Sequence, residues 1–253
     1  MFNFNFYNPT RIYFGKDRLE SINENVPVDA KVLITYGGGS AKRSGLIDKV
    51  KSILGSREIF EFSGIEPNPK YETLMKAVEV EKAENIDYIL AVGGGSTIDG
   101  TKFISLASNY EGDATELLMK GFSGVTSEMV KKVIPFGSVL TLPATGSEMN
   151  SGAVVSDNHA KYPVMSELSF PKFSILDPTL TFTLPKIQVA NGVTDAFVHV
   201  MEQYITYPVD RRNKGSVRIA EKLKGKVLKS YTSVAANGKE LDEPYIHEPM
   251  EFS

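Results

Sequence analysis

The strongest indication of the fold lies in "DYILAVGGGSTIDGTKFISLAS", residues 87–108. Its apolar run 88–92 is typical of a buried strand, three consecutive glycines follow, and the remainder has the length of a helix. Glycine loses more backbone freedom on folding than any other residue, so three in a row indicate that the main chain approaches something closely. Because the glycines stand where a helix begins, phosphate is the first candidate.

The same order of strand, glycines and helix occurs once more, earlier in the chain. "KVLITY" (31–36) precedes "GGGS", and the following "AKRSGLIDKVKSIL" has its apolar residues at helical spacing. A short apolar segment, "EIFEF" (58–62), and an amphipathic stretch, "EPNPKYETLMKAVEVEKAE" (66–84), lie between the two glycine loops. This alternation predicts an α/β fold: a parallel sheet with helices on its faces and a ligand at the carboxyl ends of the strands, where both loops lie.

The N-terminus and the composition limit the alternatives. "MFNFNFYNPTRIYFG" alternates Phe with Asn in the period of a strand and predicts a β-hairpin around "YNPTR"; it lacks the pattern of a signal peptide. The 253 residues are 42% hydrophobic with a net charge of -3, and the basic residues are scattered, which argues against nucleic acid or membrane as partners. No cysteine occurs, which suits a reducing compartment, so we expect a cytoplasmic protein.

Neither glycine loop has a standard nucleotide-binding motif. The pattern G-x-G-x-x-G fails at Lys42 and again at Ile98, and neither loop has the Gly-Lys of a P-loop. For the second loop a local explanation is open, because Ser96 as N-cap with Asp99 three residues later would make a variant capping box without any ligand. The opposing interpretation is a cluster of free backbone N–H groups that binds an anion.

Two further stretches carry polar side chains in suggestive positions. "VLTLPATGSEMNSGAV" (139–154) gathers hydroxyl and amide groups after an apolar run, which suits a polar ligand but also an ordinary solvated loop. In "LPKIQVANGVTDAFVHVMEQYIT" (184–206), Asp195 and His199 are four residues apart on a predicted helix and so share one face. They resemble half of a metal site, although a surface hydrogen bond or a core histidine is the more common origin of such a pair.

Four runs of sequence together carry a resemblance to a known family. They are "GIEPNPKYETL", "AVGGGSTIDGTKFI", "TLPATGSEMNSGAV" and "LDPTLTFTLPKIQVANGVTDAFVHVMEQYIT". Over about residues 4–210 the chain resembles the iron-containing alcohol dehydrogenases, most closely the NADPH-dependent aldehyde reductase and butanol dehydrogenase branch. The resemblance implies a dinucleotide-binding α/β domain at 1–183, an all-helical domain after it, and an active site in the cleft between them.

The resemblance also implies roles for individual residues. Cofactor contacts are expected from Gly94, Gly95 and Ser96 at the pyrophosphate, Gly38, Gly39 and Ser40 by the adenosine ribose, Asn68 beside the cofactor, and Thr141, Leu142, Thr145, Asn150, Lys161 and Leu180 on the phosphate and nicotinamide side. Asp195 and His199 match the first two of four ligands for a divalent metal, Fe²⁺ or Zn²⁺. The metal would polarise an aldehyde oxygen while the nicotinamide delivers hydride.

The first loop bears on cofactor choice. A member specific for NAD would place an acidic residue there to bind the ribose 2′-hydroxyl, whereas this chain has Ser40, Lys42 and Arg43, which favour a 2′-phosphate. NADP(H) is therefore expected in preference to NAD(H). The expected partner is a small aldehyde or alcohol, and a homodimer is compatible with the resemblance.

The C-terminal part departs from the family pattern. From about residue 211 the sequence diverges, so we expect 184–253 to be a remnant of the helical metal-binding domain, with one amphipathic helix over 217–231. Two ligands hold a metal weakly unless His247, a second subunit or water completes the site. Two functions follow as hypotheses: a metal-dependent alcohol dehydrogenase or aldehyde reductase impaired by truncation, or a non-catalytic nucleotide-binding remnant.

Overall fold

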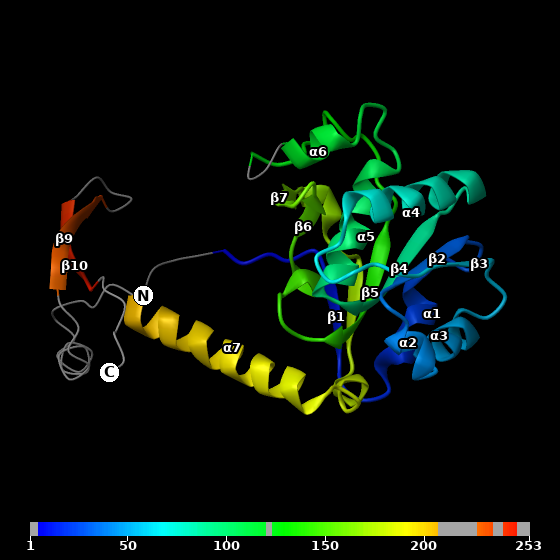
Figure 1. The fold of residues 1–253 in the computed structure, drawn as a ribbon, viewed down its shortest axis with the longest axis horizontal. Coiled ribbons are helices and arrows are strands. Elements are labelled where there is room, and N and C mark those ends of the chain that lie inside the picture. The colour runs from blue at the N-terminus through cyan, green and yellow to red at the C-terminus, as the bar shows by residue number, and fades with distance from the viewer. Residues whose placement is uncertain (1–4, 120–122, 207–226, 235–239, 247–253) are drawn as a thin grey trace. The chain divides into compact units, whose positions relative to one another are not determined.

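Six parallel strands form the main sheet of the computed structural model, in the order β1-β8-β5-β4-β2-β3 (Figure 1). The strands are β1 (Arg11–Phe14), β2 (Val32–Tyr36), β3 (Ile59–Phe62), β4 (Tyr88–Gly94), β5 (Phe136–Leu142) and β8 (Phe173–Leu176). The parallel α/β fold expected from the alternating pattern is confirmed.

The structure describes residues 5–119, 123–206, 227–234 and 240–246. Internal contacts divide the chain into two compact units, Met1–Leu184 and Pro185–Ser253. None of the helices in the described ranges has the length and apolar character needed to cross a membrane.

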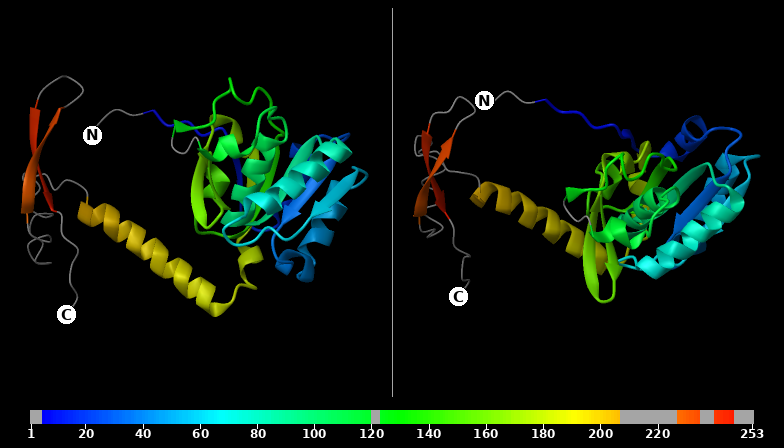
Figure 2. Two further views of the ribbon diagram at one scale, coloured as in Figure 1. Left: turned by 45° about the horizontal axis from the view of Figure 1, so that its top comes forward. Right: turned by 90° about the horizontal axis from the view of Figure 1, so that it is seen from above.

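Helices cover both faces of the sheet (Figure 2). The helices of the first unit are α1 (Ser21–Asn25), α2 (Ser40–Arg43), α3 (Leu46–Leu54), α4 (Tyr71–Glu84), α5 (Gly95–Ala107) and α6 (Thr115–Met119), with short 3-10 turns at Arg18–Glu20, Ser147–Met149 (η3), Glu167–Ser169 and Pro178–Thr181 (η5). In α3 the helical spacing buries Leu46, Ile47, Val50 and Leu54, as such a pattern predicts.

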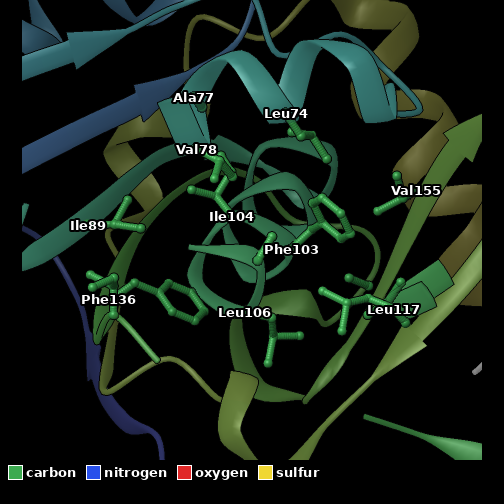
Figure 3. Packing of buried hydrophobic residues seen from close by; sticks show 14 of the residues in the cluster. Leu74, Ala77, Val78, Ile89, Phe103, Ile104, Leu106, Leu117, Phe136 and Val155 are labelled. Carbon is green, nitrogen blue, oxygen red and sulfur yellow. The ribbon is translucent and has the colours of Figure 1, made fainter. Parts of the chain in front are cut away.

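Each face of the sheet has its own apolar cluster. Side chains of α4 and α5, including Leu74, Phe103 and Ile104, form one cluster with Phe136 of β5 on one face (Figure 3). On the other face α1, α2 and α3 pack against the opposite side chains of β2 and β4. Helix α5 is buried along almost its whole length, so its position is fixed by packing rather than by solvent-exposed contacts.

An antiparallel hairpin, β6 (Gly152–Asp157) and β7 (Ala160–Met165), contacts α5. Asn158 and His159 at its tip both have positive φ, the conformation of a two-residue hairpin turn. The Val154 N–H donates to Asp99 of α5 at 3.0 Å, and the Ser156 N–H donates to the Pro69 carbonyl at 2.8 Å. The hairpin is therefore tied to the loop before α4 and to α5.

The predicted N-terminal hairpin is not found among the described residues. Residues 5–10 form no strand, and β1 pairs in parallel with β8 instead. Asn8 accepts a hydrogen bond from the Thr10 N–H, and Pro9 between them has no N–H to donate, so this segment turns locally rather than pairing. The first arm of the predicted hairpin also includes residues 1–4, which lie outside the described ranges.

The second unit contains the predicted helix, α7 (Lys186–Thr206), and an antiparallel pair of strands, β9 (Val227–Val234) and β10 (Glu240–Ile246). The strand pair was not anticipated by the expectation of an all-helical remnant. The helix predicted over 217–231 is wrong at its end, because Val227 to Tyr231 lie in β9, and its remainder lies outside the described residues.

Candidate cofactor site

The two glycine loops lie side by side at one edge of the sheet. β2 and β4 are neighbouring parallel strands in which Tyr36 is paired with Val92, so the loop after each strand leaves from the same end. This is the placement expected from the sequence. The carboxyl ends of parallel strands are where open α/β sheets bind their ligands.

Helix α5 begins at Gly95, with Gly94 as its N-cap and no capping side chain. Ser96 accepts a hydrogen bond at Oγ from the Asn68 N–H at 3.3 Å, while both oxygens of Asp99 are bonded elsewhere. The capping box that would have explained Ser96 and Asp99 without a ligand is therefore wrong. A buried helix whose first turn has no capping side chain retains the N–H groups and positive dipole end that suit an anion.

Glycine in the second loop is required by close packing within the protein. A Cβ atom at Gly95 would collide with the side chain of Thr145, and one at Gly94 would lie 3.3 Å from Leu142 Cβ. The main chain at the start of α5 thus lies directly against the loop that follows β5. This contact brings Gly94, Gly95, Leu142 and Thr145 together, all expected to be near the cofactor.

The first loop is open by comparison. A Cβ atom at Gly38 would meet nothing within 4 Å, and Gly39 caps α2 with a φ of 92°, a conformation that favours glycine. Arg43 donates from Nη1 to the Gly38 carbonyl at 3.3 Å. The first loop thus presents exposed main chain next to the Arg43 guanidinium, and these are groups that could contact a phosphorylated ribose.

A charged cluster lies beside this first loop. Glu61 accepts hydrogen bonds from Lys51, from Lys42 at 3.1 Å and from the Tyr36 hydroxyl at 2.7 Å. The hydrogen bond from Lys51 is the main cause that lowers the pKa of Glu61 to about 2, against the effect of partial burial. The hydrogen bond between Lys42 and Glu61 raises the pKa of Lys42, so this lysine keeps its positive charge next to the glycine loop.

A second charged network, centred on Lys102 of α5, was not predicted from the sequence. Its ammonium group donates to Ser147 Oγ at 2.8 Å, to Asn150 Oδ1 at 2.8 Å and to the Gly152 carbonyl at 2.7 Å. Ser147 in turn donates to Asp99 Oδ1 at 2.5 Å. One signal was available: a lysine three residues after an aspartate, within a helix otherwise made of apolar and small residues.

The remaining predicted cofactor residues are more scattered. Thr141 is half-buried at the end of β5, next to Leu142. Lys161 is exposed on β7, and Leu180 lies in η5 against the cluster under α1 and α3. Between described residues, no hydrogen bond links Lys161 or Leu180 to either glycine loop. Their expected part in cofactor binding is thus carried by the resemblance alone.

The predicted metal ligands lie on α7, in the second unit. His199 Nε2 is 3.6 Å from Asp195 Oδ2, which confirms that the two share a helix face, and His199 Nδ1 is 3.7 Å from Glu202 Oε2. Among the described residues, no three or more His, Cys, Asp or Glu side chains are grouped so that they could hold a metal ion. His247 lies outside these residues. A carboxylate and an imidazole suit Fe²⁺ or Zn²⁺, but they are fewer than the three protein ligands of a catalytic zinc.

Comparison with known proteins identifies the family of the chain. The family model for iron-containing alcohol dehydrogenase matches residues 9–178. The NADPH-dependent aldehyde reductase YqhD of Escherichia coli is 51% identical over 216 residues, covering 84% of this chain and 54% of that protein. The probable NADH-dependent butanol dehydrogenase 1 of Bacillus subtilis is 47% identical, covering 81% of this chain and 52% of that protein.

Solved structures give the same picture. The crystal structure of Escherichia coli YqhD matches with a TM-score of 0.74 at 50% identity, covering 87% of this chain and 56% of that one. NADH-dependent butanol dehydrogenase A of Thermotoga maritima matches with a TM-score of 0.72 at 39% identity, covering 87% and 55%. The chain thus spans about half the length of the relatives it matches.

Proposed function

Since this chain belongs to the iron-containing alcohol dehydrogenase family, we propose that residues 1–184 bind NADP(H) and that the protein transfers hydride between this cofactor and a primary alcohol or its aldehyde. One observation carries the proposal. The start of α5, which no side chain caps, lies beside an open glycine loop at the same edge of a parallel sheet.

In the proposed complex the two loops hold different parts of one dinucleotide. The main chain at Gly94–Ser96 faces the pyrophosphate, where helix N–H groups suit its negative charge. Gly38, Gly39 and Ser40 face the adenosine ribose. Asn68 is held beside the pyrophosphate loop by its bond to Ser96. The residues proposed for the phosphate and nicotinamide side are Thr141, Leu142, Thr145, Asn150, Lys161 and Leu180.

The proposed preference for NADP(H) rests on the first loop. Lys42 and Arg43 place two cations at its edge, and Ser40 stands where an acidic residue would favour NAD(H). The names of the relatives include both NADPH-dependent and NADH-dependent enzymes. The positive charges of this loop therefore support binding of a cofactor with a 2′-phosphate.

The bound nicotinamide would supply the hydride, and the chain's own residues would bind and orient it. Asp195 and His199 are proposed to bind a divalent metal, Fe²⁺ or Zn²⁺, weakly. These two ligands do not by themselves make a complete catalytic site. The proposed substrate is a small aldehyde or alcohol, the proposed location is the cytoplasm, and a homodimer is the proposed assembly.

A second candidate function is nucleotide binding without efficient turnover. It is favoured by one observation, the pair of ligands on α7 where catalytic zinc sites use three. The two candidates share the cofactor site in residues 1–184 and differ only in chemistry. They predict the same affinity for NADPH and different rates of aldehyde reduction.

The test uses the purified chain after dialysis. NADPH binding is measured by calorimetry, metal content by elemental analysis, and turnover by butyraldehyde-dependent oxidation of NADPH. Binding with turnover supports hydride transfer, and binding without turnover supports the second candidate. A chain that binds neither NADPH nor NADH contradicts both.

A further inference from the structure

Lys102 is a cation in the interior of the first unit. Its side chain is 0% exposed on a helix whose other buried residues are apolar or small. Removing an ammonium group from water is costly unless all of its protons find acceptors. A methionine of similar length would fill the same space without that cost, so packing alone does not account for a lysine here.

All three protons of Lys102 are directed at one segment. The acceptors are a hydroxyl, a side-chain amide and a main-chain carbonyl, contributed by Ser147, Asn150 and Gly152. An ammonium has three donors and no acceptor, so these bonds use its full capacity. Three bonds to residues 147–152 hold that loop against α5 more firmly than apolar contact would, because each bond fixes a direction.

The bond to Asn150 sets which way its amide faces. Asn150 Oδ1 accepts from Lys102 and also from the Gly152 N–H at 3.0 Å, so the oxygen must point inward, because neither partner can accept. The amide nitrogen is then left on the outer side, 3.9 Å from the place that a Cβ atom on Gly146 would take. Asn150 is exposed, so its two N–H donors are available to a ligand.

We propose that Lys102 is a positioning residue for NADP(H): from inside the protein it orients the Asn150 amide and fixes the 145–152 loop against the start of α5. The proposal rests on the proposed function, since it concerns the same cofactor. Lys102 itself does not touch the cofactor. It acts through Asn150 and through the loop that contacts Gly95.

Two carboxylates face the buried ammonium. Asp99, on α5 itself, is joined to Lys102 through Ser147, and Glu148 belongs to the short η3 turn. Burial lowers the pKa of Lys102 to about 8, and the attraction of Asp99 and Glu148 opposes that shift. A neutral amine keeps two donors in place of three, so at alkaline pH one of the three bonds is lost.

The experiment is a double-mutant cycle read out by NADPH affinity. Lys102→Met keeps the side-chain length without the charge, Asn150→Ala removes the amide, and the third variant carries both substitutions. Ser105→Ala is the matched control: it removes a buried hydrogen bond of the same helix, made to the Ile134 carbonyl, which does not belong to the 145–152 loop. Calorimetric dissociation constants are measured at pH 7, and the folded state of each variant is checked by circular dichroism.

We expect each single substitution to weaken NADPH binding about tenfold and the double variant to be weakened about tenfold as well, because the two act as one unit. Additive effects of about a hundredfold, or a Lys102→Met variant that binds as the wild type does, would overturn the proposal. Ser105→Ala is expected to bind NADPH unchanged; equal weakening in this control would show a general loss of structure and also overturn it. Absence of NADPH binding by the wild-type chain contradicts the proposed function itself.

The wild-type protein provides a second measurement if Lys102→Met does not fold. NADPH affinity should fall several-fold between pH 7 and pH 9.5 as the ammonium loses its proton, and Asn150→Ala should remove most of this dependence. An affinity that is flat over this range in the wild type, or equally steep in Asn150→Ala, contradicts a role of Lys102 through the amide.

Discussion

The two glycine loops look alike in sequence and differ in their surroundings. The second, after β4, is enclosed by Thr145, Leu142 and the Lys102 network, and its glycines are required by the protein's own packing. The first, after β2, is exposed at Gly38 and bordered by charged side chains. Close packing thus accounts for the three glycines of the second loop, whereas in the first loop Gly37 lies close to the Ile65 carbonyl and Gly38 is open. We expect the second loop to decide whether a dinucleotide binds and the first to decide which one.

The largest expected effect concerns the buried charge under the second loop. Lys102 has a folded-state pKa of about 8, below its ordinary value of 10.5, so the unfolded chain binds more protons between these two values. The free energy of unfolding should therefore rise with pH in this window, by up to about 3 kcal/mol relative to Lys102→Met. Urea unfolding of both proteins at pH 8 and pH 10.5 measures this difference; a constant difference would contradict the burial of a charged lysine.

Substituting the glycines separates packing from access. Gly95→Ala introduces a methyl group that overlaps Thr145, and we expect it to cost about 2 kcal/mol of unfolding free energy. Gly38→Ala, the matched control, adds a methyl group in open space and should change stability by less than about 0.5 kcal/mol. Thermal unfolding compares the two. Equal losses at the two positions would remove the distinction between the loops.

Selectivity should depend on the first loop alone. Ser40 is exposed at the first residue of α2, where an aspartate is well tolerated, whereas Gly39 with its φ of 92° is not a suitable position for it. Ser40→Asp should shift the ratio of NADPH to NADH affinity by about tenfold towards NADH. Ser96→Ala, in the second loop, should weaken both cofactors alike. If Ser96→Ala changed the ratio of NADPH to NADH affinity, or if Ser40→Asp left it unchanged, the first loop would not be the part that selects the cofactor.

The smallest expected effect is on stability at the first loop. The pKa of Glu61 is lowered to about 2 in the folded state. Its contribution to the free energy of unfolding is therefore present above the ordinary pKa of 4.5 and is lost as pH falls towards 2. Because the cluster is partly exposed, we expect Glu61→Gln to lose only about 1 kcal/mol at pH 7. That difference from the wild type should shrink as the pH falls from 4.5 through 2. Unfolding of both proteins, measured at a series of pH values between 7 and 2, tests whether the difference is lost in this pH range.

Hydrophobic periodicity predicted the elements of the fold that are long and regular. The apolar strands 32–36 and 88–92 and the helices after them were predicted because their patterns are local. The N-terminal hairpin failed because the partner of β1 is β8, more than 150 residues later, and no local pattern reveals such a pairing. The strand β9 was missed since an amphipathic pattern at 217–231 also fits a helix, and β10 lies in a stretch for which no element was predicted.

The glycine loops and the candidate metal ligands were predicted from the sequence, whereas the buried hydrogen-bond network behind the second loop was not. Glycines, hydroxyls and the Asp195–His199 pair stand out as residue types, and the last pair shares a face as predicted. The capping box at Ser96 was wrong because Asp99 bonds to residues about fifty positions away. Lys102 was missed for the same reason, because its three hydrogen-bond acceptors come close to it only when the loop is folded.

We propose that two adjacent glycine loops hold one dinucleotide that carries a 2′-phosphate. Calorimetric titration of the wild-type chain with NADPH and, separately, with NADH tests it most directly. We expect one NADPH per chain, bound at least about tenfold more tightly than NADH, which corresponds to about 1.4 kcal/mol. Equal affinities for the two cofactors, two NADPH molecules per chain or no binding would contradict it.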